Sequence, residues 1–161
     1  MTAPDPFPVK AVAKARPIGR LACEIDAGMR TPFEDRWRLA TDEPKVQGGS
    51  GEAPPPLVLL AGALASCLSV QVRTFARRKR IDLPPTTVDI SIEWNGYHEP
   101  PVYRAEGRKA SATFRIDTDD APGEWTQHVR HALQGCFVEA LLSPSIDLDH
   151  RVATRSGEAR L

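Results

Sequence analysis

A stretch of twenty residues without a charged side chain constrains this chain more than any other feature. It runs from Ala53 to Val72 and opens with three consecutive prolines. A basic cluster, Arg77-Arg78-Lys79-Arg80, follows it. Length and flanking charge suit a membrane span. The prolines shorten the helical part and polar residues interrupt it, which favours a buried helix in a protein that does not contact a membrane.

The periodicity within this stretch predicts one long helix. Apolar residues recur at helical spacing from Leu57 onward, and the opposite face is also mostly apolar. Pro56 suits the first helical position, and Pro84-Pro85 prevents continuation beyond about Arg80. A helix that is apolar on all sides is buried on all sides. We therefore expect a sheet on one side of this helix and a second subunit on the other.

The remaining segments predict strands around this helix and one further helix. Alternating apolar residues favour strands near 21–26, 36–39, 86–94 and 108–117, with a turn at Asn95-Gly96. An apolar stripe from Trp125 to Leu141, stopped by Pro144, predicts the second helix, and residues 146–152 predict a last strand. The order strands, helix, strands, helix, strand indicates an α+β fold with a mainly antiparallel sheet.

The length of the chain and the balance of its charges limit the classes of protein to which it can belong. The 161 residues predict a single domain over 1–161, in which residues 1–8 form a loose tail. Twenty-one basic residues balance twenty-one acidic ones, which argues against a nucleic-acid partner. The N-terminus has neither the basic start nor the apolar core of a signal peptide, so we expect a cytoplasmic location.

Three cysteines are the candidate reactive groups. Cys67 lies in the middle of the first helix, and Cys136 lies on the apolar stripe of the second, so the two sulfurs approach if the helices pack together. A cysteine on an apolar face is usually a small hydrophobic residue, and we interpret Cys23, on a strand, as core. No C-x-x-C pair occurs and the histidines lack metal-ligand spacing, so no metal site is expected.

Several segments in a fixed order carry a family resemblance. The chain has D-E-P-x-x-x-G-G at 42–49 and P-P-L-V-L-L-A-G-A-L-A-S-C at 55–67. An I-D-L-P-P link to V-D-I-S-I-E follows, and a second cysteine comes in C-F-V at 136–138. Over roughly residues 39–152, this combination resembles the OsmC/Ohr family of bacterial osmotically inducible and organic-hydroperoxide-resistance proteins, of which this chain would be a divergent member.

The resemblance implies a fold and an activity. The fold is an OsmC-like α+β domain that forms an intertwined homodimer, with the cysteine helices buried at its centre. The activity is a thiol-dependent peroxidase that reduces organic hydroperoxides. Cys67 would be peroxidatic and form a sulfenic acid, and Cys136 would resolve it into a disulfide. A dithiol or a lipoyl protein would reduce that disulfide, and no cofactor is implied.

The catalytic arginine of the family comes from the N-terminal strands, and we assign it to Arg30 in preference to Arg36 or Arg38.

Two departures from the family pattern leave an alternative open. Family reductases carry a glutamate after the proline that opens the cysteine helix, whereas this chain has Leu57 there, and Phe137 replaces a proline after the second cysteine. The alternative is a homodimer with little turnover that binds an apolar small molecule at its interface.

Overall fold

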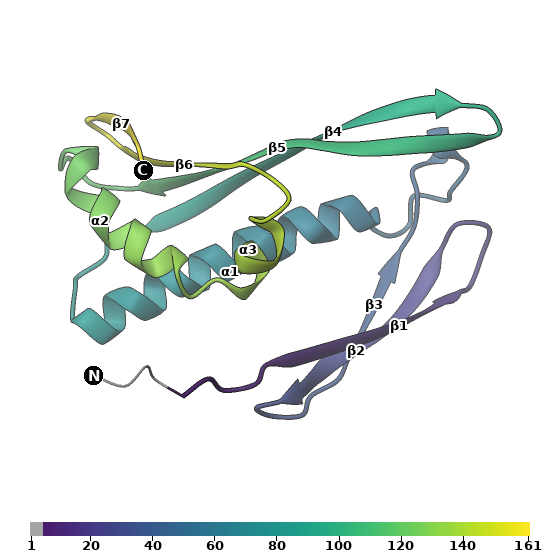
Figure 1. The fold of residues 1–161 in the computed structure, drawn as a ribbon, viewed down its shortest axis with the longest axis horizontal. Helices are drawn as coiled ribbons and strands as arrows, with labels where there is room; N and C mark the ends of the chain where they lie inside the picture. The colour runs from purple at the N-terminus through teal and green to yellow at the C-terminus, as the bar shows by residue number, and fades with distance from the viewer. Residues whose placement is uncertain (1–4) are drawn as a thin grey trace. The chain divides into compact units, whose positions relative to one another are not determined.

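The computed structural model describes residues 5–161, which form two compact units. One unit ends at Leu59, and the other extends from Leu60 to Leu161. Of the expected N-terminal tail, residues 1–4 lie outside the described residues, and residues 5–8 are exposed and belong to no helix or strand. Each unit contains its own sheet (Figure 1).

The N-terminal unit contains a three-stranded antiparallel sheet. Its strands are β1 (Lys10–Pro17), β2 (Cys23–Thr31) and β3 (Trp37–Thr41), in the order β1-β2-β3. Apolar alternation predicted β2 and β3. It did not predict β1, in which three small alanines carry little strand preference. Cys23 begins β2 and is half-buried, so its interpretation as a core residue was wrong.

A loop around a buried carboxylate connects this sheet to the long helix. Asp42 accepts hydrogen bonds from the backbone N–H groups of Glu43 (2.8 Å), Ser50 (2.8 Å) and Gly51 (3.0 Å). It also accepts the Ser50 hydroxyl at 2.5 Å. These donors, the hydroxyl first, hold the pKa of Asp42 below its usual value. The short 3-10 helix η1 (Lys45–Gln47) lies within this loop, which contains the D-E-P-x-x-x-G-G segment.

The long helix α1 (Pro56–Lys79) starts and ends where the prolines and the basic cluster predicted. Within a single chain, one stripe of it is buried: Leu64, Leu68, Val72 and Ala76. Val70, on another side, remains 47% exposed. By length and composition α1 could cross a membrane, a test that core helices of soluble proteins also pass. The C-terminal unit therefore buries only one stripe of this apolar helix.

The C-terminal unit is built on a four-stranded sheet in the order β4-β5-β6-β7. β4 (Thr86–Glu99) and β5 (Val102–Ile116) are antiparallel, β6 (Leu148–Thr154) runs parallel to β5, and β7 (Gly157–Arg160) pairs with β6. The parallel pair needs a crossover connection, which the helices between β5 and β6 supply. Figure 1 shows these helices and α1 on the same side of this sheet.

The predicted turn at Asn95-Gly96 was wrong. Both residues belong to β4, where Asn95 pairs with Glu106 and Gly96 with Ala105. An irregularity in register between Glu93 and Trp94 lets the ladder continue past them. The chain reverses instead at Pro100-Pro101, because neither proline has an N–H to extend the ladder. The two strands therefore form a longer hairpin than the alternation alone indicated.

The prediction of a single second helix was also wrong. Two helices, α2 (Pro122–Leu133) and α3 (Phe137–Leu142), occupy this region, with Cys136 between them in an extended conformation (φ −85°, ψ 104°). Gly135 lies against α1, where an added Cβ would come within 2.7 Å of Gln71 Oε1. The break at Gly135 allows a close approach to α1 and releases Cys136 from helical geometry.

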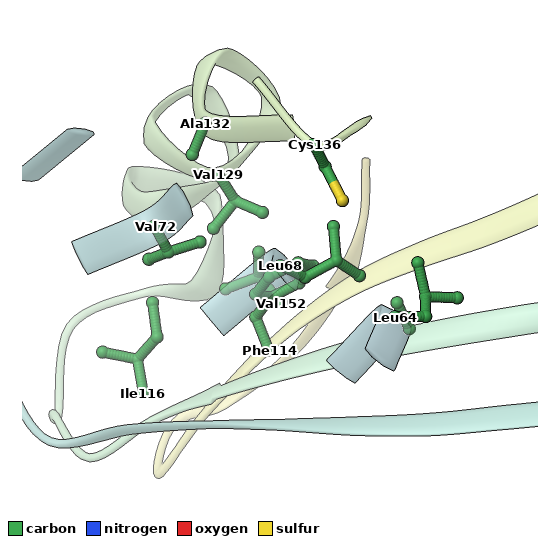
Figure 2. Packing of buried hydrophobic residues seen from close by; sticks show 10 residues of the cluster. Leu64, Leu68, Val72, Phe114, Ile116, Val129, Ala132, Cys136 and Val152 are labelled. Atoms are coloured by element: carbon green, nitrogen blue, oxygen red, sulfur yellow. The ribbon is translucent and has the colours of Figure 1, made fainter. Parts of the chain in front are cut away.

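The core of the C-terminal unit lies between α1, α2 and the sheet. It consists of Leu64, Leu68, Val72, Ala112, Phe114, Ile116, Val129, Ala132, Cys136 and Val152. Figure 2 shows the side chain of Cys136 directed into this cluster. The predicted stripe on the second helical region thus contributes Val129, Ala132 and Cys136 to the core, although the helix is interrupted. Cys67 packs against the cluster from α1 and is half-buried.

Candidate active site

Two cysteines far apart in the sequence meet in the C-terminal unit. Cys67 comes from the middle of α1 and Cys136 from the start of α3, 69 positions later. Their Sγ atoms lie 2.9 Å apart, and the Cys136 thiol donates to Cys67 Sγ. The sequence predicted that these sulfurs approach if the helices pack together, and the structure brings them into contact. Both are free thiols.

The two thiols differ in exposure. Cys67 is half-buried at the edge of the core, one helical turn from Leu64 and beside Leu68. Cys136 is 2% exposed. A small reactant from solvent can therefore reach Cys67 more readily than Cys136. This asymmetry suits one thiol that meets an external oxidant and a second that reacts only with the first.

The backbone around Cys136 makes its sulfur a helix cap. Cys136 is the N-cap residue of α3, and its Sγ accepts the backbone N–H of Glu139 at 3.4 Å. A side chain at the N-cap normally accepts from the second or third residue of the helix. Serine or threonine usually fills this role, and here a cysteine does. The cap fixes the direction of the thiol relative to Cys67.

Burial raises the pKa of the Cys136 thiol to about 12. The largest cause is removal of the thiolate from water, and the hydrogen bond to Cys67 acts in the same direction. The N–H of Glu139 acts in the opposite direction, because it stabilises the thiolate. At neutral pH Cys136 is therefore a thiol, and reaction at its sulfur requires removal of a proton.

A carboxylate–imidazole pair lies next to this thiol, and the sequence analysis missed it. Glu139 Oε1 lies 3.2 Å from His150 Nε2 of β6, and both side chains are largely buried, at 15% and 13% exposure. The spacing Cys-x-x-Glu matches a helix-capping pattern and could have drawn attention to Glu139. Nothing in the sequence pattern indicates that His150 is its partner.

The third predicted site residue, Arg30, lies on β2 in the N-terminal unit. It lines a groove of about 600 Å³ in the small sheet, together with Lys14, Arg36, Arg38 and Trp37. Asp26 also lines the groove, and it lies within ion-pair distance of Arg38 at 3.7 Å. Cys67 and Cys136 both belong to the other unit. An interaction of Arg30 with Cys67 stays a prediction.

The position that carries a glutamate in family reductases is solvent-exposed here. Leu57 is 54% exposed at the start of α1. The nearby Glu43 is half-buried in the Asp42 loop, and Glu52 is exposed. Among residues 5–161, no group of three or more histidine, cysteine or acidic side chains is placed to hold a metal ion.

The matching family model is described as OsmC-like protein, and it covers residues 49–151. This range includes Cys67, Cys136 and α1 to α3. It also includes His150 but not Arg30. A search among curated proteins gives no match.

Solved structures of similar fold extend over nearly the whole chain. An organic hydroperoxide resistance protein OsmC from Legionella pneumophila is 20% identical, with a TM-score of 0.64 over 89% of this chain and 96% of that one. An OsmC-like hydroperoxide resistance protein from Jannaschia sp. CCS1 is 26% identical, with a TM-score of 0.53 over 94% and 96%. The organic hydroperoxide resistance protein OhrB of Bacillus subtilis is 13% identical, with a TM-score of 0.58 over 91% and 98%. These likenesses show a common fold.

Proposed function

Because the chain belongs to the OsmC-like protein family, we propose that it is a thiol-dependent peroxidase that reduces organic hydroperoxides. The observation that carries the proposal is the 2.9 Å contact between Cys67 and Cys136. A half-buried thiol in contact with a buried one is the arrangement that two-cysteine oxidation chemistry needs. The names of the Legionella, Jannaschia and Bacillus proteins, which refer to hydroperoxide resistance, agree with it.

The first step of the proposed reaction takes place at Cys67. Its thiolate attacks the terminal oxygen of a hydroperoxide ROOH, the O–O bond breaks, and the alkoxide leaves as the alcohol ROH after it takes up a proton. Cys67 becomes a sulfenic acid and the peroxide is reduced by two electrons. Arg30 is proposed to stabilise the thiolate, on the strength of the family resemblance.

The second step joins the two sulfurs. Cys136 loses its proton and its sulfur attacks Cys67 Sγ, and the S–O bond breaks as water leaves. The product is a Cys67–Cys136 disulfide, which an external dithiol or a lipoyl protein reduces by thiol–disulfide exchange. The closeness of the two sulfurs favours this step, because the attack needs little chain movement.

An apolar setting for Cys67 supports organic hydroperoxides as the substrate class. The neighbouring turns of α1 present Leu64 and Leu68, which belong to the buried core. Each methylene of a substrate that leaves water contributes about 0.8 kcal/mol to binding. Hydrogen peroxide has no methylene and gains nothing from this term. We therefore expect bulky alkyl or aryl hydroperoxides to react faster than hydrogen peroxide.

A second candidate function is favoured by Leu57. Without the family's glutamate at this position, the protein would bind an apolar small molecule at a dimer interface and turn over peroxide slowly or not at all. In both candidates we propose a homodimer in the cytoplasm. The exposed apolar residues on α1, among them Val70, support this assembly.

Peroxide consumption with a dithiol donor tests the proposal. We expect faster consumption of cumene hydroperoxide than of hydrogen peroxide, no consumption by Cys67→Ser, and a single turnover by Cys136→Ser. Cys23→Ser is the matched control and should keep full activity, because neither proposed step uses the Cys23 thiol.

Two outcomes would count against parts of this proposal. Equal rates with both peroxides would contradict the claim that the apolar surroundings of Cys67 favour organic hydroperoxides. If neither peroxide is consumed and Cys67 stays reduced, the ligand-binding candidate takes its place.

A further inference from the structure

Glu139 has the spacing of a helix-capping residue but its carboxylate does not cap the helix. In a capping box, the third helical residue reaches back to the backbone N–H of the N-cap residue. Here the N–H of Cys136 donates instead to the carbonyl oxygen of Leu133 at 2.9 Å. The Glu139 carboxylate is therefore released from capping, while its backbone N–H still contacts Cys136 Sγ.

The released carboxylate is buried and incompletely bonded. Its Oε1 lies 3.2 Å from His150 Nε2, close enough for an ion pair but not aligned as a hydrogen bond. Among the described residues, none provides a hydrogen bond to Glu139 Oε2, which is shielded from solvent. A buried carboxylate oxygen without a donor is costly to maintain. It also retains open lone pairs that can accept a proton.

Groups on two elements act electrostatically on the Cys136 thiol. Cys67 on α1 and Glu139 on α3 both act to keep the proton on Cys136. His150 on β6 lies against the Glu139 carboxylate. The Glu139 carboxylate thus lies near enough for its charge to oppose a thiolate at Cys136. A base in this position gains from taking the proton, because doing so removes its own opposing charge.

The geometry points to the Glu139 carboxylate, held by His150, as the acceptor of the Cys136 proton during disulfide formation. This inference rests on the proposed function and adds the residues that control its second step. The proton passes from Cys136 Sγ to Glu139 Oε2 while the sulfur attacks Cys67 Sγ. The hydroxide that leaves Cys67 then recovers that proton and departs as water. Glu139 ends as it began, and His150 is a positioning residue.

The test measures disulfide formation without any peroxide, in a Cys23→Ser background. 5,5′-Dithiobis(2-nitrobenzoic acid) first forms a mixed disulfide on Cys67, and attack by Cys136 then releases a second thionitrobenzoate that is followed by absorbance. We expect the parent rate to stay nearly level between pH 7 and pH 9. Glu139→Gln should be slower by about 100-fold at pH 7. Its rate should rise about tenfold per pH unit, because only the thiolate of Cys136 then reacts.

Matched variants separate a proton acceptor from a structural residue. Glu139→Asp should restore a level pH profile, and Glu124→Gln, an exposed glutamate on α2, should behave as the parent. Thermal unfolding of each variant checks that the fold is intact. A faster rate in Glu139→Gln would mean that the carboxylate only opposes the thiolate, and this would overturn the inference. If Glu139→Gln is slower but keeps the pH profile of the parent, Glu139 only positions α3. This result would also overturn the inference.

A parallel experiment with one equivalent of cumene hydroperoxide keeps the two proposals distinguishable. If the parent forms no sulfenic acid on Cys67, the proposed peroxidase function fails. The mixed-disulfide experiment still decides the role of Glu139 in that case, because it does not depend on peroxide. If the parent forms the sulfenic acid and Glu139 acts as the proton acceptor, Glu139→Gln should accumulate the sulfenic acid before the disulfide appears.

Discussion

The pKa values of two buried side chains, Cys136 and His128, are shifted in opposite directions for the same physical reason. Burial disfavours the charged form of each group. It raises the pKa of Cys136, whose charged form is the thiolate, and it lowers the pKa of His128, whose charged form is the imidazolium. His128 is 7% exposed, whereas its neighbour His131 is exposed.

His128 makes the stability of the protein depend on pH. Its ring packs edge-on against Phe75 and Trp125, at centroid distances of 5.1 Å and 6.0 Å. The folded protein resists protonation there, whereas the unfolded chain takes up the proton near pH 6.5. The stabilisation is therefore complete above about pH 6.5 and is lost as the pH falls below that value, by at most about 1.4 kcal/mol per pH unit.

Urea unfolding at pH 7.5 and pH 5 measures this effect. The loss of unfolding free energy on acidification should be smaller in His128→Leu than in the parent. His98→Gln alters an exposed histidine on β4 and should keep the loss seen in the parent. An unchanged loss in His128→Leu would show that other groups cause the acid sensitivity.

At the residue scale, the sequence could predict that the two cysteines meet but not what surrounds them. The family resemblance singled out Cys67 and Cys136, whereas their apolar stripes alone favour unreactive core cysteines. Glu139 and His150 come from elements that only the tertiary fold brings together, and neither alters a hydrophobic pattern. A sequence pattern carries no direct information about such a pair.

At the scale of elements, the loop at 42–51 depends on close backbone packing. A Cβ at Gly49 would overlap the carbonyl oxygen of Glu43 and come within 2.8 Å of Asp42 Oδ1. Backbone cannot move aside as a flexible side chain can. Gly49→Ala should therefore lower the free energy of unfolding by more than about 1 kcal/mol.

Chemical denaturation of two glycine variants checks this expectation. Gly62 on α1 has no atom within 4 Å of an added Cβ. Gly62→Ala should be neutral or stabilising, by up to about 1 kcal/mol, because alanine is the better helix former. If Gly49→Ala matches Gly62→Ala, the loop at 42–51 is looser than its hydrogen bonds indicate.

Elements with strong local signals could be predicted from the sequence, and those set by distant contacts could not. Prolines and a basic cluster marked both ends of α1. The break between α2 and α3 comes at Gly135, where an added Cβ would meet Gln71 of α1, and the apolar stripe alone suggested a continuous helix. Asn95-Gly96 is a strong local turn signal, but pairing with β5 overrides it.

At the scale of the whole molecule, the uncovered side of α1 leads us to expect that two copies of the chain associate. Several large apolar residues on this helix stay exposed in the single chain, and monomers rarely tolerate large apolar patches. A twofold homodimer that covers them is expected to be stable at micromolar concentration. Val70→Glu should shift the protein toward monomer, because it places a charge on that apolar side.

Sedimentation velocity or light scattering reports this shift. Gln127→Glu adds the same charge at an exposed position on α2 and should leave the dimer intact. A parent protein that remains monomeric at micromolar concentration would contradict the expectation.

The distance along the chain between the two cysteines affects how long each redox form survives. A disulfide between residues 69 positions apart would close a long loop in the unfolded chain. In the chain-entropy account, this stabilises the oxidised protein by roughly 3–5 kcal/mol. Proteases that degrade unfolded chains would therefore remove reduced molecules first. In the proposed reaction, the oxidised form that awaits its reductant would then be the longest-lived form in the cell.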